Sequence, residues 1–165
     1  MAVQKFQDYS GYIKIPSLPQ VISDNGYVRA EWNETGVMMK QPNQEIKSVK
    51  GIISMFKGLK DGESVDNYFH DVFISYNEMI SIRRIVSSMG GRKNFKHSIQ
   101  IKGKNNTIVV DTTTLTGEQW SKLINACLYF NRSLEIDQII MKIYVNKKIP
   151  AMYATRKMVN YSKQI

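Results

Sequence analysis

The feature that most constrains the fold is the alternation of apolar and polar residues between Phe95 and Lys102. Every second side chain belongs to one set, Phe95, His97, Ile99 and Ile101. Successive side chains of a strand point to opposite faces of its sheet, so this pattern predicts a half-buried strand. Lys104-Asn105-Asn106 marks a turn, and the β-branched run from Thr107 to Thr113 predicts a returning strand.

A helix is expected directly after this hairpin. Thr116 and Gln119 have the spacing of a capping box, in which each residue satisfies a free backbone amide of the other. Apolar residues then recur every three or four positions, at Trp120, Leu123, Ile124, Cys127 and Phe130. The spacing predicts an amphipathic helix that ends at Phe130 and lies behind a sheet or in an oligomer interface.

Two further helices are predicted upstream. Residues 44–59 carry an apolar face made of Ile46, Val49, Ile52, Ile53, Phe56 and Leu59. The β-branched residues in this stretch leave a pair of strands as the alternative. Residues 76–89 follow Ser75, which has capping-box spacing with Glu78, and they precede Gly90-Gly91, a helix stop.

The remaining periodic segments predict strands at 12–15, 27–32, 37–41 and 69–75, while 133–145 fits either a helix or a strand. These elements predict an α+β fold with antiparallel β-sheets packed against helices. Strands precede a capped helix in 27–89 and again in 95–130, which hints at a duplicated strands-then-helix unit. The length predicts one domain, 1–146, followed by a basic C-terminal tail, 147–165.

Charge divides the chain into two halves. Residues 1–78 hold eight Lys and Arg against ten Asp and Glu, whereas residues 79–165 hold fifteen against four, and the total net charge is +9. Such one-sided charge is typical of chains that neutralise phosphate. The pattern therefore favours a polyanionic partner over incidental basicity.

Several classes of function are not indicated. The single cysteine, Cys127, excludes an internal disulfide framework and suits a reducing compartment. No apolar run reaches the ~20 residues that cross a bilayer, and residues 1–8 do not resemble a signal peptide, so we expect a cytoplasmic protein with no membrane partner. His70 and His97 lack metal-ligand spacing. Glu45-Ile46-Lys47, with Asp24 upstream, resembles a nuclease motif but lacks a second adjacent carboxylate. We predict no enzyme activity, cofactor or metal.

Nucleic-acid contacts are predicted where cations and aromatic rings share strands. Single-stranded nucleic acid is bound by cations that follow the backbone and rings on which bases stack. The predicted phosphate contacts are Lys14, Arg29, Lys40, Arg92, Lys93, Lys96, Lys102 and Lys104. The predicted stacking rings are Tyr12, Tyr27, Trp32 and Phe95. For any single ring, a place in the core is the alternative.

Residues 72–86, Val-Phe-Ile-Ser-Tyr-Asn-Glu-Met-Ile-Ser-Ile-Arg-Arg-Ile-Val, resemble the segment of the Whirly family in which a strand runs into a short helix. Residues 96–101 and Glu118-Gln119-Trp120-Ser121-Lys122-Leu123 continue in the same order, and this helix start is also similar to the positive cofactor four family. The resemblance implies curved antiparallel sheets with helices behind them, oligomerisation through the helices, and single-stranded DNA bound across the sheets. Trypanosome guide-RNA-binding proteins use the same scaffold.

We therefore expect a homo-oligomer that binds single-stranded DNA with little sequence preference, in replication, recombination or transcription. RNA is the alternative ligand, because phosphate and stacking contacts do not distinguish the two. The small size and the Lys-, Asn- and Ile-rich composition fit a phage or low-GC bacterial protein. Two other classes stay open: a regulator that binds an acidic host protein, and a structural assembly protein that uses its basic tail.

Overall fold

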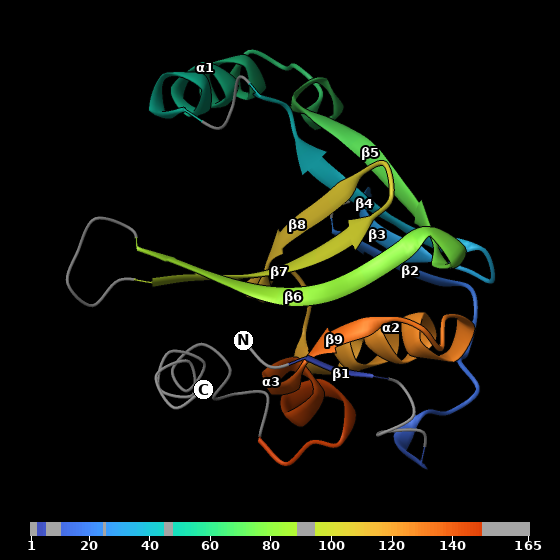
Figure 1. The fold of residues 1–165 in the computed structure, drawn as a ribbon. Coiled ribbons are helices and arrows are strands. Elements are labelled where there is room, and N and C mark those ends of the chain that lie inside the picture. The colour runs from blue at the N-terminus through green and yellow to red at the C-terminus, as the bar shows by residue number, and fades with distance from the viewer. Residues whose placement is uncertain (1–2, 6–10, 25, 45–47, 89–94, 150–165) are drawn as a thin grey trace.

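The computed structural model describes residues 3–5, 11–24, 26–44, 48–88 and 95–149. Within them the chain forms an α+β fold with two sheets (Figure 1). The four-stranded sheet is antiparallel throughout, and its strands in order are β2 (Gln20–Asp24), β3 (Tyr27–Trp32), β4 (Gly36–Pro42) and β5 (Phe69–Ser75). No helix in this described part combines the length and apolar character needed to span a membrane.

The five-stranded sheet has the order β1-β9-β6-β7-β8. Its strands are β1 (Val3–Lys5), β9 (Glu135–Asp137), β6 (Met79–Ser88), β7 (Phe95–Gly103) and β8 (Thr107–Asp111). Only the β6–β9 pair is parallel. The longest pairing is β6 with β7, which runs from Met79 opposite Gly103 to Ser88 opposite Phe95.

The described residues also form three α-helices: α1 (Val49–Lys60), α2 (Gly117–Phe130) and the short α3 (Gln138–Ile140), which continues as a π-helical turn, Met141–Val145. The predicted capping box is present, because the Thr116 hydroxyl accepts the Gln119 N–H at 3.1 Å and the Gln119 side chain accepts the Thr116 N–H at 2.9 Å. In α1 the Ser48 hydroxyl accepts the Gly51 N–H at 3.0 Å. The alternative of a strand pair in this segment is therefore wrong.

The helix predicted at 76–89 is also wrong. Residues Tyr76–Glu78 form a single 3-10 turn, Ser75 makes no capping hydrogen bond, and Met79–Ser88 is strand β6. The isoleucines and valine of this stretch favour a strand, and the long pairing with β7 satisfies its backbone. The duplicated strands-then-helix unit is therefore not present, since the helix that would end its first copy is a strand.

Other predicted elements agree or shift. The strands at 27–32, 37–41, 69–75, 95–102 and 107–113 correspond to β3, β4, β5, β7 and β8. Residues 12–15 form no strand, whereas β2, which was not predicted, follows shortly after them. The ambiguous segment 133–145 contains both the short strand β9 and the α3 turn.

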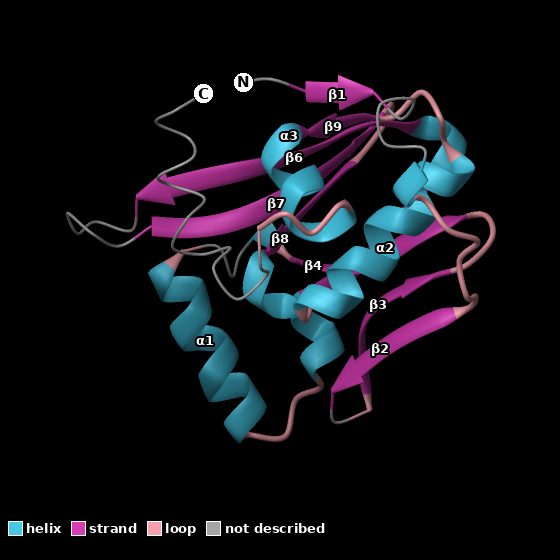
Figure 2. Cartoon of the chain, turned by 90° about the horizontal axis from the view of Figure 1, so that it is seen from below, coloured by secondary structure: helices cyan, strands magenta, loops and turns pink. Residues whose placement is uncertain are grey.

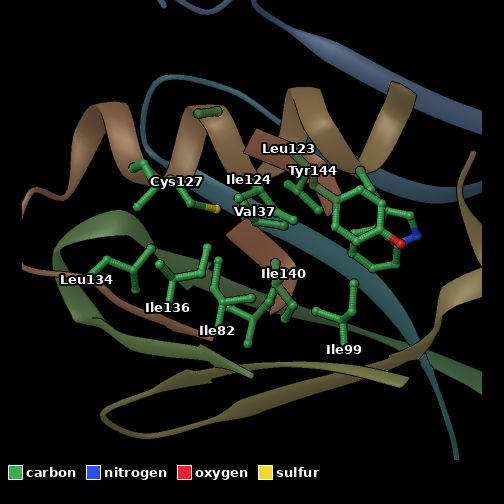
Figure 3. Packing of buried hydrophobic residues seen from close by; sticks show 14 of the residues in the cluster. Val37, Ile82, Ile99, Leu123, Ile124, Cys127, Leu134, Ile136, Ile140 and Tyr144 are labelled. Atoms are coloured by element: carbon green, nitrogen blue, oxygen red, sulfur yellow. The ribbon is translucent and has the colours of Figure 1, made fainter. Parts of the chain in front are cut away.

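The core lies where α2 meets both sheets. Leu123, Ile124 and Cys127 of α2 are buried against Ile82 and Ile99 of the five-stranded sheet, and Val37 comes from the other sheet (Figure 3). Each such side chain contributes roughly 1.5–3 kcal/mol when it is fully buried. Burial also raises the pKa of the Cys127 thiol to about 12, so that the thiol stays protonated at neutral pH.

The two sheets join beside Ile74 of β5. A side chain on Gly103 would bring its Cβ to 2.9 Å from Ile74 Cγ2, so only glycine permits this close approach. Asn106 Nδ2 donates to the Phe73 carbonyl at 2.7 Å, and Gln41 Oε1 accepts the Val109 N–H at 3.0 Å. The β7–β8 hairpin is thereby fixed against β4 and β5.

A buried ion pair links β6 to the start of α3. Arg84 Nε lies 3.2 Å from Asp137 Oδ2, and the Asp137 side chain has no exposed surface. Asp137 Oδ1 also accepts the Ile139 N–H at 2.7 Å. Arg83 and Glu135 form a comparable pair on the opposite face of the same strands, 3.9 Å apart and about half exposed.

These two pairs predict different costs of truncation. Asp137→Ala removes the buried carboxylate that faces Arg84 and should lower the free energy of unfolding by about 3–5 kcal/mol. Glu135→Ala should cost roughly 0–1 kcal/mol, because water screens the exposed pair. Urea denaturation of both variants checks this, and equal losses would show that the buried pair does not stabilise the sheet.

Candidate nucleic-acid interface

The outer face of the five-stranded sheet, turned away from α2, carries the exposed lysines of β7. Lys96 and Lys102 are exposed on this face, while His97, Ile99 and Ile101 alternate with them and are buried. We call Arg83, Lys96 and Lys102, together with Lys104 in the turn after β7, the basic face. Lys102 lies six positions after Lys96 on the same strand, which corresponds to about 20 Å along the sheet.

The register places polar side chains beside these cations. Ser87 of β6 lies opposite Lys96, and Arg83 lies opposite Gln100. On the other side of β7, Thr107 lies opposite Lys102. Serine, threonine and glutamine side chains also donate hydrogen bonds to phosphate oxygens, so the face presents donors in adjacent rows.

The charges of the basic face are largely uncompensated. Among the described residues, none of Lys96, Lys102 and Lys104 forms an ion pair, and only Arg83 has an acidic partner, Glu135. Asp111, the other acid at the margin of this face, accepts the N–H and hydroxyl of Thr113 at 2.9 and 2.7 Å. The cations are therefore available to an anionic ligand.

The predicted cations of the four-stranded sheet are paired with acids instead. Lys40 Nζ lies 2.7 Å from Asp71 and 3.5 Å from Asp66, and the hydrogen bond with Asp71 raises the pKa of Lys40. Arg29 lies 4.0 Å from Asp24. These contacts neutralise the positive charge locally, so Arg29 and Lys40 do not extend the basic face.

The predicted rings do not join the basic face either. Trp32 is 1% exposed and belongs to the core, so its predicted stacking role is wrong. Tyr27 packs edge-on against Phe69 with ring centroids 5.8 Å apart, and Lys40 lies over its ring. Both rings are on the outer face of the four-stranded sheet.

Tyr12 and Lys14 lie on the opposite side of the molecule, where they line a cleft beside α2. Arg92, Lys93, the side chain of Phe95 and residues 150–165 of the basic tail lie outside the described part of the chain, as do residues 45–47 of the nuclease-like motif. The structure therefore groups Lys96, Lys102 and Lys104 of the predicted contacts.

Sequence reasoning missed Arg83 as a contact, because it placed this residue on a helix. The β-branched residues around it, Ile82, Ile85 and Val86, are the sequence signal that could have indicated a strand. The sequence also gave no sign that the apolar face of α1 would be exposed. In the described residues, no three His, Cys, Asp or Glu side chains gather closely enough to hold a metal ion.

His97 lies beneath the basic face, on the core side of β7. It is 5% exposed, and its Nδ1 has no hydrogen-bond partner among the described residues. Burial lowers the pKa of His97 below its ordinary 6.5, Asp111 opposes this, and the nearby Arg84 guanidinium lowers the pKa further. The imidazole is therefore neutral in the folded protein near neutral pH.

This shift predicts a loss of stability in mild acid. Because the pKa of His97 is lowered in the folded protein, the unfolded chain binds the proton more readily. The stabilising contribution of His97 to the free energy of unfolding is therefore complete above pH 6.5 and is lost as the pH falls toward the folded-state pKa. Urea denaturation at several pH values, compared with His97→Gln, checks this. The variant should lose stability less steeply below pH 6.5, and parallel curves would contradict the assignment.

No protein-family model matches this chain, and no curated protein or solved structure is significantly similar to it. A function for the chain therefore has to be argued from the residues of the basic face and their surroundings.

Proposed function

We propose that this protein is a non-enzymatic, single-stranded DNA-binding protein that holds the DNA backbone on its basic face. The observation that supports this most strongly is the row of exposed, unneutralised lysines on one side of β7 and in the turn after it, at Lys96, Lys102 and Lys104. A rigid sheet fixes the spacing of these cations, so little order has to be imposed when a strand binds.

Binding would depend mainly on phosphate contacts. Each lysine that neutralises a phosphate releases condensed counterions, which favours association at low salt. Among the described side chains, the outer face of β6, β7 and β8 carries no aromatic ring. With few groups to contact the bases, the face suits binding with little sequence preference. The preference for DNA as a single strand is an expectation from the Whirly resemblance.

The proposal predicts the effect of removing two charges from β7. Fluorescence anisotropy would measure binding of labelled single-stranded DNA, duplex DNA and RNA of equal length at several salt concentrations. The double variant Lys96→Gln/Lys102→Gln should weaken binding of single-stranded DNA and reduce the slope of log K against log salt by about 1.4, since each phosphate contact to a single strand contributes about 0.7.

The matched control is Lys57→Gln/Lys60→Gln, which removes the same charge from α1, outside the residues that define the basic face. If both double variants weaken binding equally, net charge rather than the basic face is responsible. Equal affinity for all three ligands would remove the single-strand preference. Thermal unfolding of each variant establishes that the fold is intact.

A second candidate function, binding of an acidic protein, is favoured by the exposed apolar stripe of α1. Val49, Ile52, Ile53 and Phe56 lie on one helix face and are 39–75% exposed. Their i, i+3, i+4, i+7 spacing is the pattern by which a helix enters an apolar groove. No residue of α1 is buried, and α1 lies at the edge of the molecule, apart from α2 and α3, in Figure 1 and Figure 2.

The charges of α1 favour an acidic partner over a second copy. Lys50, Lys57 and Lys60 flank the stripe, and α1 contains no acidic residue. Two copies of α1 would bring like charges together, whereas an apolar groove with an acidic rim would complement both features. This is the chemistry that the second candidate requires.

Phe56→Ser tests this second candidate, because its exposed side chain can be shortened without opening the core. A partner recovered with the wild-type protein should be acidic, should rebind the purified chain directly, and should lose at least tenfold in affinity for the variant. Higher salt should weaken the complex. Analytical ultracentrifugation of both proteins gives the result that would contradict this candidate. If the wild-type chain is a homo-oligomer and Phe56→Ser is a monomer, α1 pairs with a second copy instead.

A further inference from the structure

A cleft of about 300 Å³ lies on the side of α2 that is turned away from the core. One wall is the segment 12–17, the second is the polar side of α2, and the third is the end of the π-helical turn with Lys147. The basic face lies across the five-stranded sheet from this cleft, so the two are separate sites. The volume is at the lower end for small-molecule sites.

The walls of the cleft are held together by the side chain of Asn125. Its Oδ1 accepts the Lys14 N–H at 2.9 Å, and its Nδ2 donates to the Lys14 carbonyl, also at 2.9 Å. Both backbone groups of Lys14 are thereby fixed to α2, although the segment forms no strand. The backbone position from which the Lys14 side chain extends at the cleft is therefore fixed before a ligand binds.

The cleft has an excess of positive charge. Lys14, Lys122 and Lys147 line it together with one acid, Glu118, and that carboxylate lies 3.7 Å from Lys122. Lys14 and Lys147 have no ion-pair partner within the described residues. Lys147 also has φ of 56°, an uncommon backbone conformation for lysine. An anionic group is the ligand that this arrangement favours.

An aromatic ring stands beside these cations. Tyr12 lines the cleft and is 49% exposed, and Ile15 and Pro16 add an apolar wall next to it. A planar base stacks on such a ring, and an adjacent phosphate is neutralised by lysine. Tyr12 and Lys14 were predicted as nucleic-acid contacts, and the structure places both of them here rather than on the basic face.

We propose that this cleft binds one nucleoside monophosphate group, with the base on Tyr12 and the phosphate between Lys14 and Lys147. The group has two sources, a free nucleotide and the phosphorylated end of a strand. The cleft shares no residue with the basic face, so this proposal and the proposed function are tested independently.

The test uses the full chain and titrates it with adenosine 5′-monophosphate, adenosine and inorganic phosphate, followed by NMR or calorimetry. The monophosphate should bind at least tenfold more tightly than adenosine. Lys14→Gln and Lys147→Asn should each remove most of this difference, and asparagine tolerates the left-handed backbone at 147. Tyr12→Leu should weaken the nucleotide and leave inorganic phosphate unchanged.

Further experiments distinguish a strand end from a free nucleotide as the ligand, and the cleft from the basic face as the binding site. Oligonucleotides with a 5′-phosphate or a 5′-hydroxyl show whether a strand end is preferred over the free nucleotide. Lys96→Gln/Lys102→Gln should not change nucleotide affinity, and Lys60→Gln serves as the single-charge control. The proposal is overturned if neither the nucleotide nor the 5′-phosphorylated strand depends on Lys14 and Lys147, or if adenosine binds as tightly as its monophosphate.

Discussion

The pairing of β6 with β7 fixes both the core and the basic face. The same register that buries Ile82, Ile99 and Ile101 directs Lys96 and Lys102 outward. A slip of one residue would exchange the two faces of β7 and place both ammonium groups against α2, where an unpaired charge is costly. The free energy of burying the isoleucines therefore also maintains the arrangement of the lysines.

Sequence patterns predicted the elements whose signals are local. The alternation in 95–102 and the capping box at Thr116 each depend on neighbouring residues, and both are confirmed. The error at 76–89 arose because Met79, Ile82, Val86 and Met89 satisfy helical spacing while the β-branched residues among them also suit a strand. Pairing with β7, whose partner residues lie 7 positions away at Ser88 and Phe95 and 24 positions away at Met79 and Gly103, decided between the two. No local pattern reports such a partner.

Of the basic residues predicted to contact nucleic acid, those that the structure keeps in the basic face form no ion pair with described residues from other strands. Lys96 and Lys102 were placed together because they share one strand. Arg29 and Lys40 looked equivalent in the sequence, but Asp24, Asp66 and Asp71 neutralise them once the strands pair. Trp32 differs from an exposed ring only in the face of β3 on which it lies. Ion pairs between distant strands and the choice of face are properties of the assembled sheet.

The contact between Gln41 and β8 has a consequence for how molecules of this protein meet. β8 is an outer strand of its sheet, and unpaired amides on such strands recruit strands of other chains. The Val109 N–H is already donated to the Gln41 side chain, and the neighbouring sheet flanks the same strand. An incoming strand would have to displace this amide cap before it could extend the sheet. Extension of the sheet along β8 would therefore first cost the hydrogen bond that this one side chain accepts from Val109.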